Sequence, residues 1–308
     1  MVIKMKIFVT GVAGQLGHDV MNELSKRGYE GIGSDIAEEY SGIQDGSDVT
    51  KMQYVSLDIT NETAVKKVLQ EVCPDVVIHC AAWTAVDMAE DEDKIEKVKA
   101  INVGGTQNIA SVCKELDCKM VYISTDYVFD GQGTEPWKPD CKDYKPLCVY
   151  GQTKLDGELA VSQMLDKYFI VRIAWVFGVN GNNFIKTMLK VGKTHDTLKV
   201  VNDQIGTPTY TLDLARLLVD MVETEKYGYY HATNEGGYIS WYDFACEIFK
   251  QAGYSTKVLP VTTEEYGISK AARPFNSRLD KSKLTEQGFE LLPTWQDALS
   301  RYLKEIEF

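Results

Sequence analysis

The sequence predicts an α/β fold in which a doubly wound, mostly parallel sheet is joined to a smaller, mostly C-terminal lobe. Up to residue 232, short apolar runs alternate with amphipathic segments at helical spacing, as in chains that build parallel sheets. A glycine-rich turn joins the first apolar run to the first amphipathic segment. The run 75–80 is almost wholly apolar, which is typical of a strand covered by helices on both faces.

The first strand–turn–helix unit predicts a dinucleotide site. A strand is expected at 7–9 and a helix at 15–26, with glycines 11, 14 and 17 in and after the turn. Gly11 permits the turn, Gly14 lets the backbone approach a pyrophosphate, and Gly17 allows close packing of helix and strand. The N-terminus of the helix would then face the phosphates. The alternative is a glycine-rich turn without a ligand.

The remaining elements follow from apolar periodicity and from capping residues. Further strands are expected at 31–35, 54–57, 75–80, 119–124, 168–174, 198–201 and 229–232. Helices are expected at 61–72 (capped by Thr60 or Asn61), 88–116, 150–165, 182–191, 213–224, 240–252 and 294–306, and a loop at 38–51. Residues 1–174 plus about 208–233 are expected to form a Rossmann-type dinucleotide-binding domain. About 175–207 plus 234–308 would form the substrate-binding lobe.

Composition excludes several classes of protein. The 308 residues carry a formal net charge of −12, which argues against nucleic acid or an anionic membrane surface as a partner. No apolar run approaches the ~20 residues of a membrane helix, and no signal peptide is expected. The 7 cysteines form no C-x-x-C pair, which favours reduced thiols and the cytoplasm. The 4 histidines do not share a ligand spacing, so no zinc site is expected.

Asp35 favours NADH over NADPH. It ends the second expected strand, 18 positions after Gly17, close to the ~20-residue spacing at which an acid bonds the adenosine ribose. No Lys or Arg follows before Lys51 to receive a 2′-phosphate. The alternative is a solvated loop acid.

Tyr150 and Lys154 are the expected proton donor and its cationic neighbour. They lie at i and i+4, so their side chains leave one face of a helix about 6 Å apart along its axis. An adjacent ammonium would lower the pKa of the phenol and make it a better donor. Thr125 lies at the end of an expected strand. A substrate carbonyl bonded to both Thr125 and Tyr150 would be polarised for hydride attack. By itself, Tyr-x-x-x-Lys is more often a pair on a helix surface.

These motifs and several others occur together in one order along the chain. The segments are 10–17, 81–90, 124–131, 150–158, 172–177, 183–188, 202–209 and 273–279. With them the chain resembles the extended short-chain dehydrogenase/reductases and, more narrowly, the dTDP-4-dehydrorhamnose reductase family. The resemblance covers nearly the whole chain. It implies hydride transfer from NADH or NADPH to the C4 ketone of dTDP-6-deoxy-L-lyxo-4-hexulose, with dTDP-L-rhamnose as the product.

The resemblance also implies roles for individual residues. Its catalytic set is Thr125, Tyr150 and Lys154. Its cofactor set is Gly11, Gly14, Gln15, Leu16, Gly17, Asp35, Asp58, Ile59, Ala81, Ala82, Asn102, Tyr150 and Lys154. Its substrate set is Thr84, Val86, Asp87, Thr125, Asp126, Tyr127, Trp175, Asn183, Gln204 and Arg273.

Four of the substrate residues have structural alternatives. Trp175 would stack on thymine or contact the sugar, or else be a core tryptophan. Asn183 and Gln204 would bond the sugar nucleotide, or else cap or order a loop. Arg273 would counter the diphosphate, or else form a surface salt bridge.

Departures from the family pattern leave further alternatives. Trp83 stands where many members carry a histidine. Some members bind Mg²⁺ through carboxylates at a dimer interface, but Glu305 and Glu307 fit a solvated helix end, so no metal is expected. A homodimer is possible, and the sequence does not decide between a monomer and a dimer. The alternative functions are a sugar-nucleotide epimerase or dehydratase of the same superfamily, and a non-catalytic regulatory subunit like that of methionine adenosyltransferase.

Overall fold

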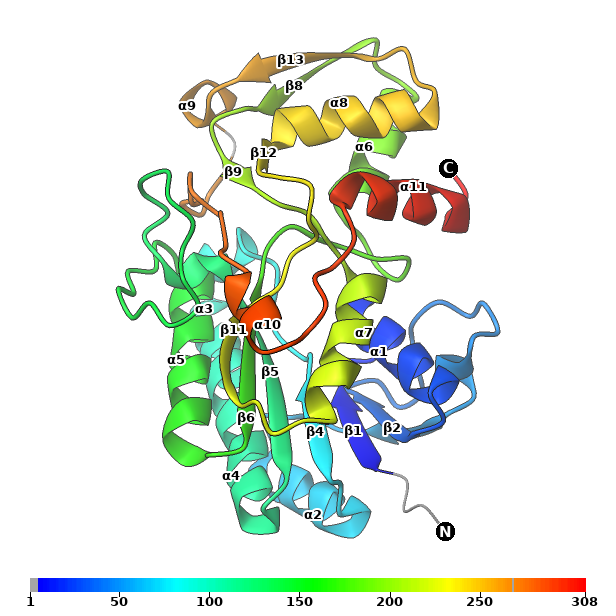
Figure 1. Ribbon diagram of the computed structural model, residues 1–308, viewed down its shortest axis with the longest axis vertical. Helices are drawn as coiled ribbons and strands as arrows, with labels where there is room; N and C mark the ends of the chain where they lie inside the picture. The colour runs from blue at the N-terminus through cyan, green and yellow to red at the C-terminus, as the bar shows by residue number, and fades with distance from the viewer. Residues whose placement is uncertain (1–4, 268) are drawn as a thin grey trace.

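The computed structural model describes residues 5–267 and 269–308 and contains a seven-stranded parallel sheet with helices on both faces (Figure 1). The order across the sheet is β11-β6-β5-β4-β1-β2-β3. The strands are β1 (Lys6–Thr10), β2 (Glu30–Asp35), β3 (Gln53–Ser56), β4 (Val76–His79), β5 (Lys119–Thr125), β6 (Tyr168–Ile173) and β11 (Gly228–His231). This confirms the predicted fold class. The order reverses between β1 and β4, and the crevice at the carboxyl ends there is the usual ligand site of such sheets.

Helices cover each face of the sheet with a separate apolar layer. On one face α1 (Gln15–Lys26) packs against α7 (Thr211–Val222), and on the other α4 (Thr106–Leu116) packs between α2 (Glu62–Val72) and α5 (Val149–Met164). Strand β1 shows why its sequence is continuously apolar. Ile7 and Val9 belong to the core of the first face and Phe8 to the core of the second, and all three side chains are fully buried.

The predicted long helical region over 88–116 is mostly helical, but it is divided where the chain turns at the charged run 91–94. The structure has a 3-10 turn η2 (Met88–Glu90), a short α3 (Ile95–Lys99), a π-helical turn η3 (Ala100–Gly105) and then α4. Glu90 accepts a hydrogen bond of 2.7 Å from the Val149 N–H, so the break ties η2 to the start of α5.

A smaller lobe lies above the carboxyl ends of the sheet (Figure 1). Its larger elements are α6 (Phe184–Gly192), β8 (Thr197–Val201), α8 (Trp241–Ala252), β13 (Lys257–Val261), α9 (Thr263–Tyr266) and α11 (Trp295–Glu305). Short strand pairs join it to the sheet domain, namely β7 (Val176–Phe177) with β10 (Thr209–Tyr210) and β9 (Ile205–Gly206) with β12 (Ile239–Ser240). Strand β13, which pairs in parallel with β8, was not predicted, because its exposed Pro260 hides the strand pattern.

One segment of the predicted substrate-binding lobe packs against the sheet. Residues 282–292 were placed in the smaller lobe, but α10 (Ser282–Glu286) packs beside β11. Leu284, Phe289 and Leu292 belong to the apolar core that α1 and α7 share with the sheet. These side chains pack beside β11, and the division into two domains stays a prediction.

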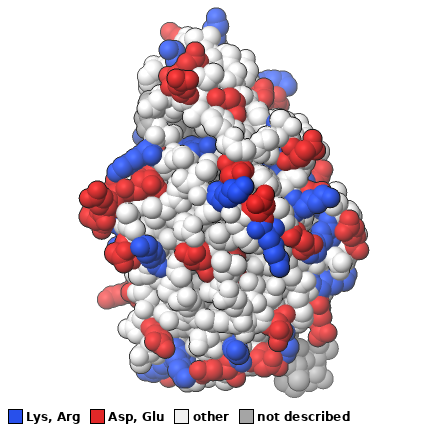
Figure 2. All heavy atoms as spheres, turned by 90° about the vertical axis from the view of Figure 1, so that its left-hand side faces the viewer, with Lys and Arg blue, Asp and Glu red and all other residues white. Residues whose placement is uncertain are grey.

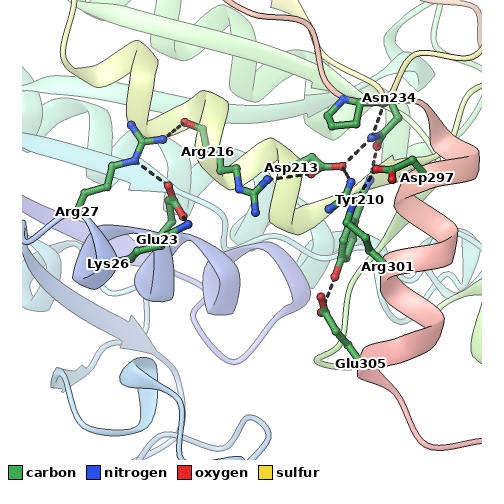
Figure 3. Close-up of polar contacts among 11 residues, drawn as sticks. Glu23, Lys26, Arg27, Tyr210, Asp213, Arg216, Asn234, Asp297, Arg301 and Glu305 are labelled. Carbon is green, nitrogen blue, oxygen red and sulfur yellow. Dashed lines mark hydrogen bonds and ion pairs between the residues drawn. The ribbon is translucent and has the colours of Figure 1, made fainter.

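Polar contacts anchor the C-terminal helix α11 on α7 (Figure 3). Asp213 is buried on α7 and accepts hydrogen bonds from Arg301 (2.6 Å) and Asn234 (2.9 Å). The Tyr210 hydroxyl donates to Glu305 at 2.6 Å. Glu305 is exposed at the end of α11, as predicted, and its carboxylate also takes part in this anchor.

A buried ion pair joins β6 to α5. Arg172 and Glu158 are both fully buried, and the guanidinium makes two hydrogen bonds to the carboxylate, at 2.8 and 2.7 Å. Arg172 also donates to the Pro139 carbonyl (3.0 Å) and the Tyr144 hydroxyl (3.1 Å). The pair therefore fixes the long connection between β5 and α5 against the sheet.

Glu158→Gln should lower the free energy of unfolding by about 3–5 kcal/mol, because it leaves the buried Arg172 charge uncompensated. Denaturant titration measures this. The exposed Lys66–Glu115 pair (2.8 Å) provides the control, and Glu115→Gln should cost less than about 1 kcal/mol. A loss at position 158 as small as that of the control would contradict this account of the pair.

Candidate active site

A cavity of about 490 Å³ opens at the carboxyl ends of the central strands. It lies at the point where the strand order reverses. The structure brings these predicted residues together in its wall: Gly11, Gly14, Gln15, Leu16, Gly17, Asp35, Asp58, Ile59, Ala81, Ala82, Thr84, Val86, Thr125, Asp126, Tyr127, Tyr150, Lys154 and Trp175.

The glycine turn is shaped by close approaches of the backbone. Gly11 has a positive φ of +73°, and a Cβ there would lie 2.6 Å from the Ala81 nitrogen. A Cβ on Gly17 would lie 2.3 Å from the Gly11 carbonyl oxygen. No side chain caps the N-terminus of α1, so its first N–H groups are available to an anion.

Carboxylates mark the end of the cavity near β2 and β3. Asp35 accepts hydrogen bonds from the Ala13 N–H (3.0 Å) and the Ile36 N–H (2.8 Å), so it also braces the glycine turn. Asp58 accepts from Thr60. Among the described residues that line this cavity, Lys154 is the one Lys or Arg side chain.

Thr125, Tyr150 and Lys154 meet at the other end of the cavity. Thr125 ends β5 and is buried, and it donates a 3.0 Å hydrogen bond to Asp126. Tyr150, on the first turn of α5, lines the same cavity. Lys154 lies one turn further and donates to the Ile123 carbonyl at 2.7 Å.

Burial sets the protonation of these groups. It raises the pKa of Tyr150 well above its ordinary value, against the opposing effect of the neighbouring Thr125 side chain. The predicted net lowering of this pKa was wrong, because burial outweighs the influences that favour the phenolate. Burial lowers the pKa of Lys154 to about 7 and raises the pKa of Asp126 to about 6. Tyr150 therefore keeps its proton at neutral pH and can donate it.

A second cavity of about 380 Å³ adjoins the first and shares Tyr127 and Trp175 with it. Trp175 has a positive φ of +52° and stacks on Trp241 with ring centroids 3.8 Å apart. The predicted Asp87, Gln204 and Arg273 line this second cavity. Gln204 also donates to Thr263 at 3.0 Å.

Arg273 lines the second cavity and is partly neutralised there. It donates to Asp87 (2.7 Å), to the Tyr127 hydroxyl (3.1 Å) and to Ser269 (3.0 Å). Asp87 also accepts from the Ala271 N–H at 3.0 Å, so it holds the segment that carries Arg273.

Two predicted site residues lie outside both cavities. Asn102 accepts from the Trp83 N–H (2.8 Å) and donates to Thr153 (3.1 Å) beneath α5. Asn183 caps α6 and donates to Gln15 (3.0 Å) and to the Tyr302 hydroxyl (2.9 Å). Both amides are used inside the protein, and Asn183 has the capping role that was its structural alternative. Ligand contacts of Asn102 and Asn183 stay predictions.

Several lining residues were not predicted. Ser34 and Ser124 line the first cavity with buried hydroxyls that have no hydrogen-bond partner among the described residues. Ser124 adjoins Thr125 in a recognised motif, so the sequence did carry a signal for it. Lys199 and Trp241 line the second cavity from segments without a motif.

The family described as RmlD substrate binding domain matches residues 5–308. The chain belongs to this family. A dTDP-4-dehydrorhamnose reductase of Aggregatibacter actinomycetemcomitans is 39% identical, over 96% of this chain and 97% of the relative. The crystal structure of a dTDP-4-dehydrorhamnose reductase of Clostridium acetobutylicum is 42% identical with a TM-score of 0.87, covering 98% of this chain and 99% of that one. The crystal structure of a dTDP-4-dehydrorhamnose reductase of Bacillus anthracis in complex with NADP is 38% identical with a TM-score of 0.87. It covers 99% of this chain and 100% of that one.

In this member of the RmlD family, a buried hydrogen-bond chain supports the floor of the first cavity. The Thr106 hydroxyl donates to the Asn102 carbonyl (2.7 Å) and so accepts from His79 Nε2 (3.2 Å). His79 Nδ1 therefore accepts from Thr10 (2.7 Å), which in turn accepts from the Ala81 N–H (3.2 Å). These hydrogen bonds fix the tautomer of His79 and the position of Ala81.

His79 should make the protein less stable as the pH falls. Burial and the nearby Lys154 charge lower the pKa of folded His79 to about 3, below its ordinary 6.5. Between these pH values His79 binds a proton in the unfolded chain but not in the folded protein. The free energy of unfolding therefore falls by up to about 1.4 kcal/mol for each unit by which the pH decreases.

Denaturant titrations between pH 7 and pH 4 (about the window of that shift) should give a shallower pH slope for His79→Gln than for the unaltered protein. His195→Gln, at an exposed histidine, is the matched control. Parallel slopes for His79→Gln and the unaltered protein would show that His79 is protonated in the folded state.

Proposed function

We propose that this chain is an NAD(P)H-dependent reductase of the C4 ketone of dTDP-6-deoxy-L-lyxo-4-hexulose, with dTDP-L-rhamnose as its product. The observation that carries the proposal is the meeting of Thr125, Tyr150 and Lys154 in a cavity that begins at a glycine turn and adjoins a second cavity. The activity named for the relatives supports the choice of substrate.

The residues of the first cavity fit a nicotinamide dinucleotide. The glycine turn packs its backbone closely against Ala81 and the start of α1, and α1 presents uncapped N–H groups for a pyrophosphate. Ser34 and Ser124 offer buried hydroxyls without partners. When bound, the reduced cofactor supplies a hydride to the ketone carbon.

The chain's own residues handle the proton and the developing charge. The Thr125 and Tyr150 hydroxyls bind the ketone oxygen, and Tyr150 transfers its proton to that oxygen as the carbon accepts the hydride. The C=O bond thereby becomes a CH–OH group. The ammonium of Lys154 stabilises the phenolate left on Tyr150, and a proton from solvent restores the phenol.

The second cavity would hold the nucleotide of the substrate. Trp175 and Trp241 offer aromatic surface for a pyrimidine ring, and Gln204 offers an amide. Arg273 and Lys199 supply positive charge for the diphosphate on an otherwise acidic protein. Asp87 offsets part of this charge and keeps Arg273 in place.

The compartment and the partners are part of the same proposal. The seven cysteines are all free, which supports the reducing cytoplasm. In the parts of the chain that the structure describes, no helix is long and apolar enough to span a membrane. On the face drawn in Figure 2, basic side chains stand among acidic ones, which supports a protein without a nucleic-acid partner. A homodimer stays a prediction.

Tyr150→Phe should lower kcat by about 10²–10⁴-fold, because the hydroxyl that donates the proton is removed. A steady-state assay of NADH oxidation with the keto sugar measures this, and fluorescence titration should show unchanged NADH binding. Normal turnover by the variant would exclude Tyr150 as the donor. Tightly held NAD without net oxidation of NADH would indicate an epimerase instead.

NADH should be used more efficiently than NADPH, because Asp35 and Asp58 lie at one end of the cavity and Lys154 is the one cation among its described lining residues. Comparison of kcat/KM for the two cofactors tests this. Asp35→Ser should raise the NADPH-to-NADH ratio of kcat/KM about tenfold or more, since a carboxylate beside a 2′-phosphate is repulsive. Glu38→Ser, at an exposed acid just beyond the strand, is the control. An unchanged ratio in Asp35→Ser would remove Asp35 from cofactor selection.

A further inference from the structure

The ammonium of Lys154 lies over the ring of a buried tyrosine that the mechanism above does not use. Its Nζ is 4.0 Å from the centroid of the Tyr122 ring, and both side chains are nearly or fully buried. Tyr122 belongs to β5, three residues before Thr125. A cation at this distance from the face of an aromatic ring is attracted by the ring's quadrupole, and more strongly when water is excluded.

Tyr122 also contacts the helix from which Lys154 extends. Its hydroxyl donates a 3.2 Å hydrogen bond to the Lys154 backbone carbonyl. Gly157, on the same helix, leaves room for the phenol, because a Cβ at this position would lie 2.3 Å from the Tyr122 hydroxyl oxygen. One tyrosine thus meets the lysine at both ends, at the ammonium and at the main chain.

We propose that Tyr122 is a positioning residue for Lys154 and that the face of its ring holds the ammonium in place. The inference rests on the proposed function only for what Lys154 does in catalysis. With the Ile123 carbonyl at 2.7 Å, the Tyr122 ring forms the direct support for the charge. Without the ring, the buried site would favour the neutral amine more strongly.

Other titratable groups around Lys154 are bonded elsewhere or keep one protonation state at neutral pH. Glu158 and Cys80 favour its charged form, but Glu158 is bonded to Arg172. His79 stacks on Tyr122 with centroids 5.9 Å apart and is held neutral by burial. Tyr150 stands one turn away on α5 and keeps its proton.

The test is an NMR titration of lysine labelled with ¹³C at Cε, in the full-length protein, with the Lys154 signal assigned by its loss in Lys154→Arg. Tyr122→Phe keeps the ring face and should leave the pKa of Lys154 unchanged. Tyr122→Leu should lower this pKa by about 1, which corresponds to a tenfold lower affinity of the amine for its proton. Pentafluorophenylalanine at position 122 keeps the ring shape but removes its attraction for cations, so it should act like leucine even if Tyr122→Leu does not fold.

Tyr230→Leu is the matched control. Tyr230 is another buried tyrosine of the same sheet, but it packs in the core on the opposite face and has Lys283 over its ring at 5.3 Å. This variant should leave the Lys154 titration unchanged. Equal pKa values of Lys154 with tyrosine, leucine and pentafluorophenylalanine at position 122 would overturn the inference.

The pH profile of activity gives a second readout. Because the reaction uses Lys154 as an ammonium, a lower pKa moves the basic limb of the kcat profile to lower pH. We expect this shift in the leucine and pentafluorophenylalanine variants and not in Tyr122→Phe. A protein that reduces no keto sugar would refute the proposed function, while the NMR titration would still decide the role of Tyr122.

Discussion

The burial of Lys154 between α5 and β5 is the constraint on which the site depends. A lysine in this position is costly, because burial lowers its pKa to about 7. The protein offsets this cost with the Ile123 carbonyl and the face of Tyr122. Helix α5 must therefore pack closely on the strand, and this packing also brings Tyr150 to Thr125. The buried Arg172–Glu158 pair holds the same helix against β6, one strand further along the sheet.

The site combines a rigid floor with recognition elements from distant segments. Gly11 and Ala81 approach so closely that no side chain fits between them, and the chain from Thr106 through His79 to Thr10 fixes this contact. The second cavity instead takes Arg273 from a late segment, where Asp87 and Tyr127 hold it. A net charge of −12 thus leaves room for anionic ligands, because the positive features are placed locally.

Local spacing explains what could be predicted from the sequence. The glycine turn and the Tyr150–Lys154 pair depend on residues within one or two turns of each other, and the structure places both as expected. Asn183 lies in an equally recognisable segment, yet its amide bonds Gln15 and Tyr302, which are far away in the sequence. Its role depends on tertiary contacts that spacing cannot reveal. The raised pKa of Tyr150 has the same origin, since burial depends on the whole fold.

The central claim is that Thr125, Tyr150 and Lys154 bring a ketone to the reactive face of a bound nicotinamide. Transfer of label from NADH deuterated at both C4 positions to the keto sugar tests this claim most directly. The account predicts one deuterium at C4 of the product hexose for each NADH oxidised, with the new hydroxyl proton taken from solvent. Oxidation of NADH without label at C4, or a product labelled at another carbon, would contradict it.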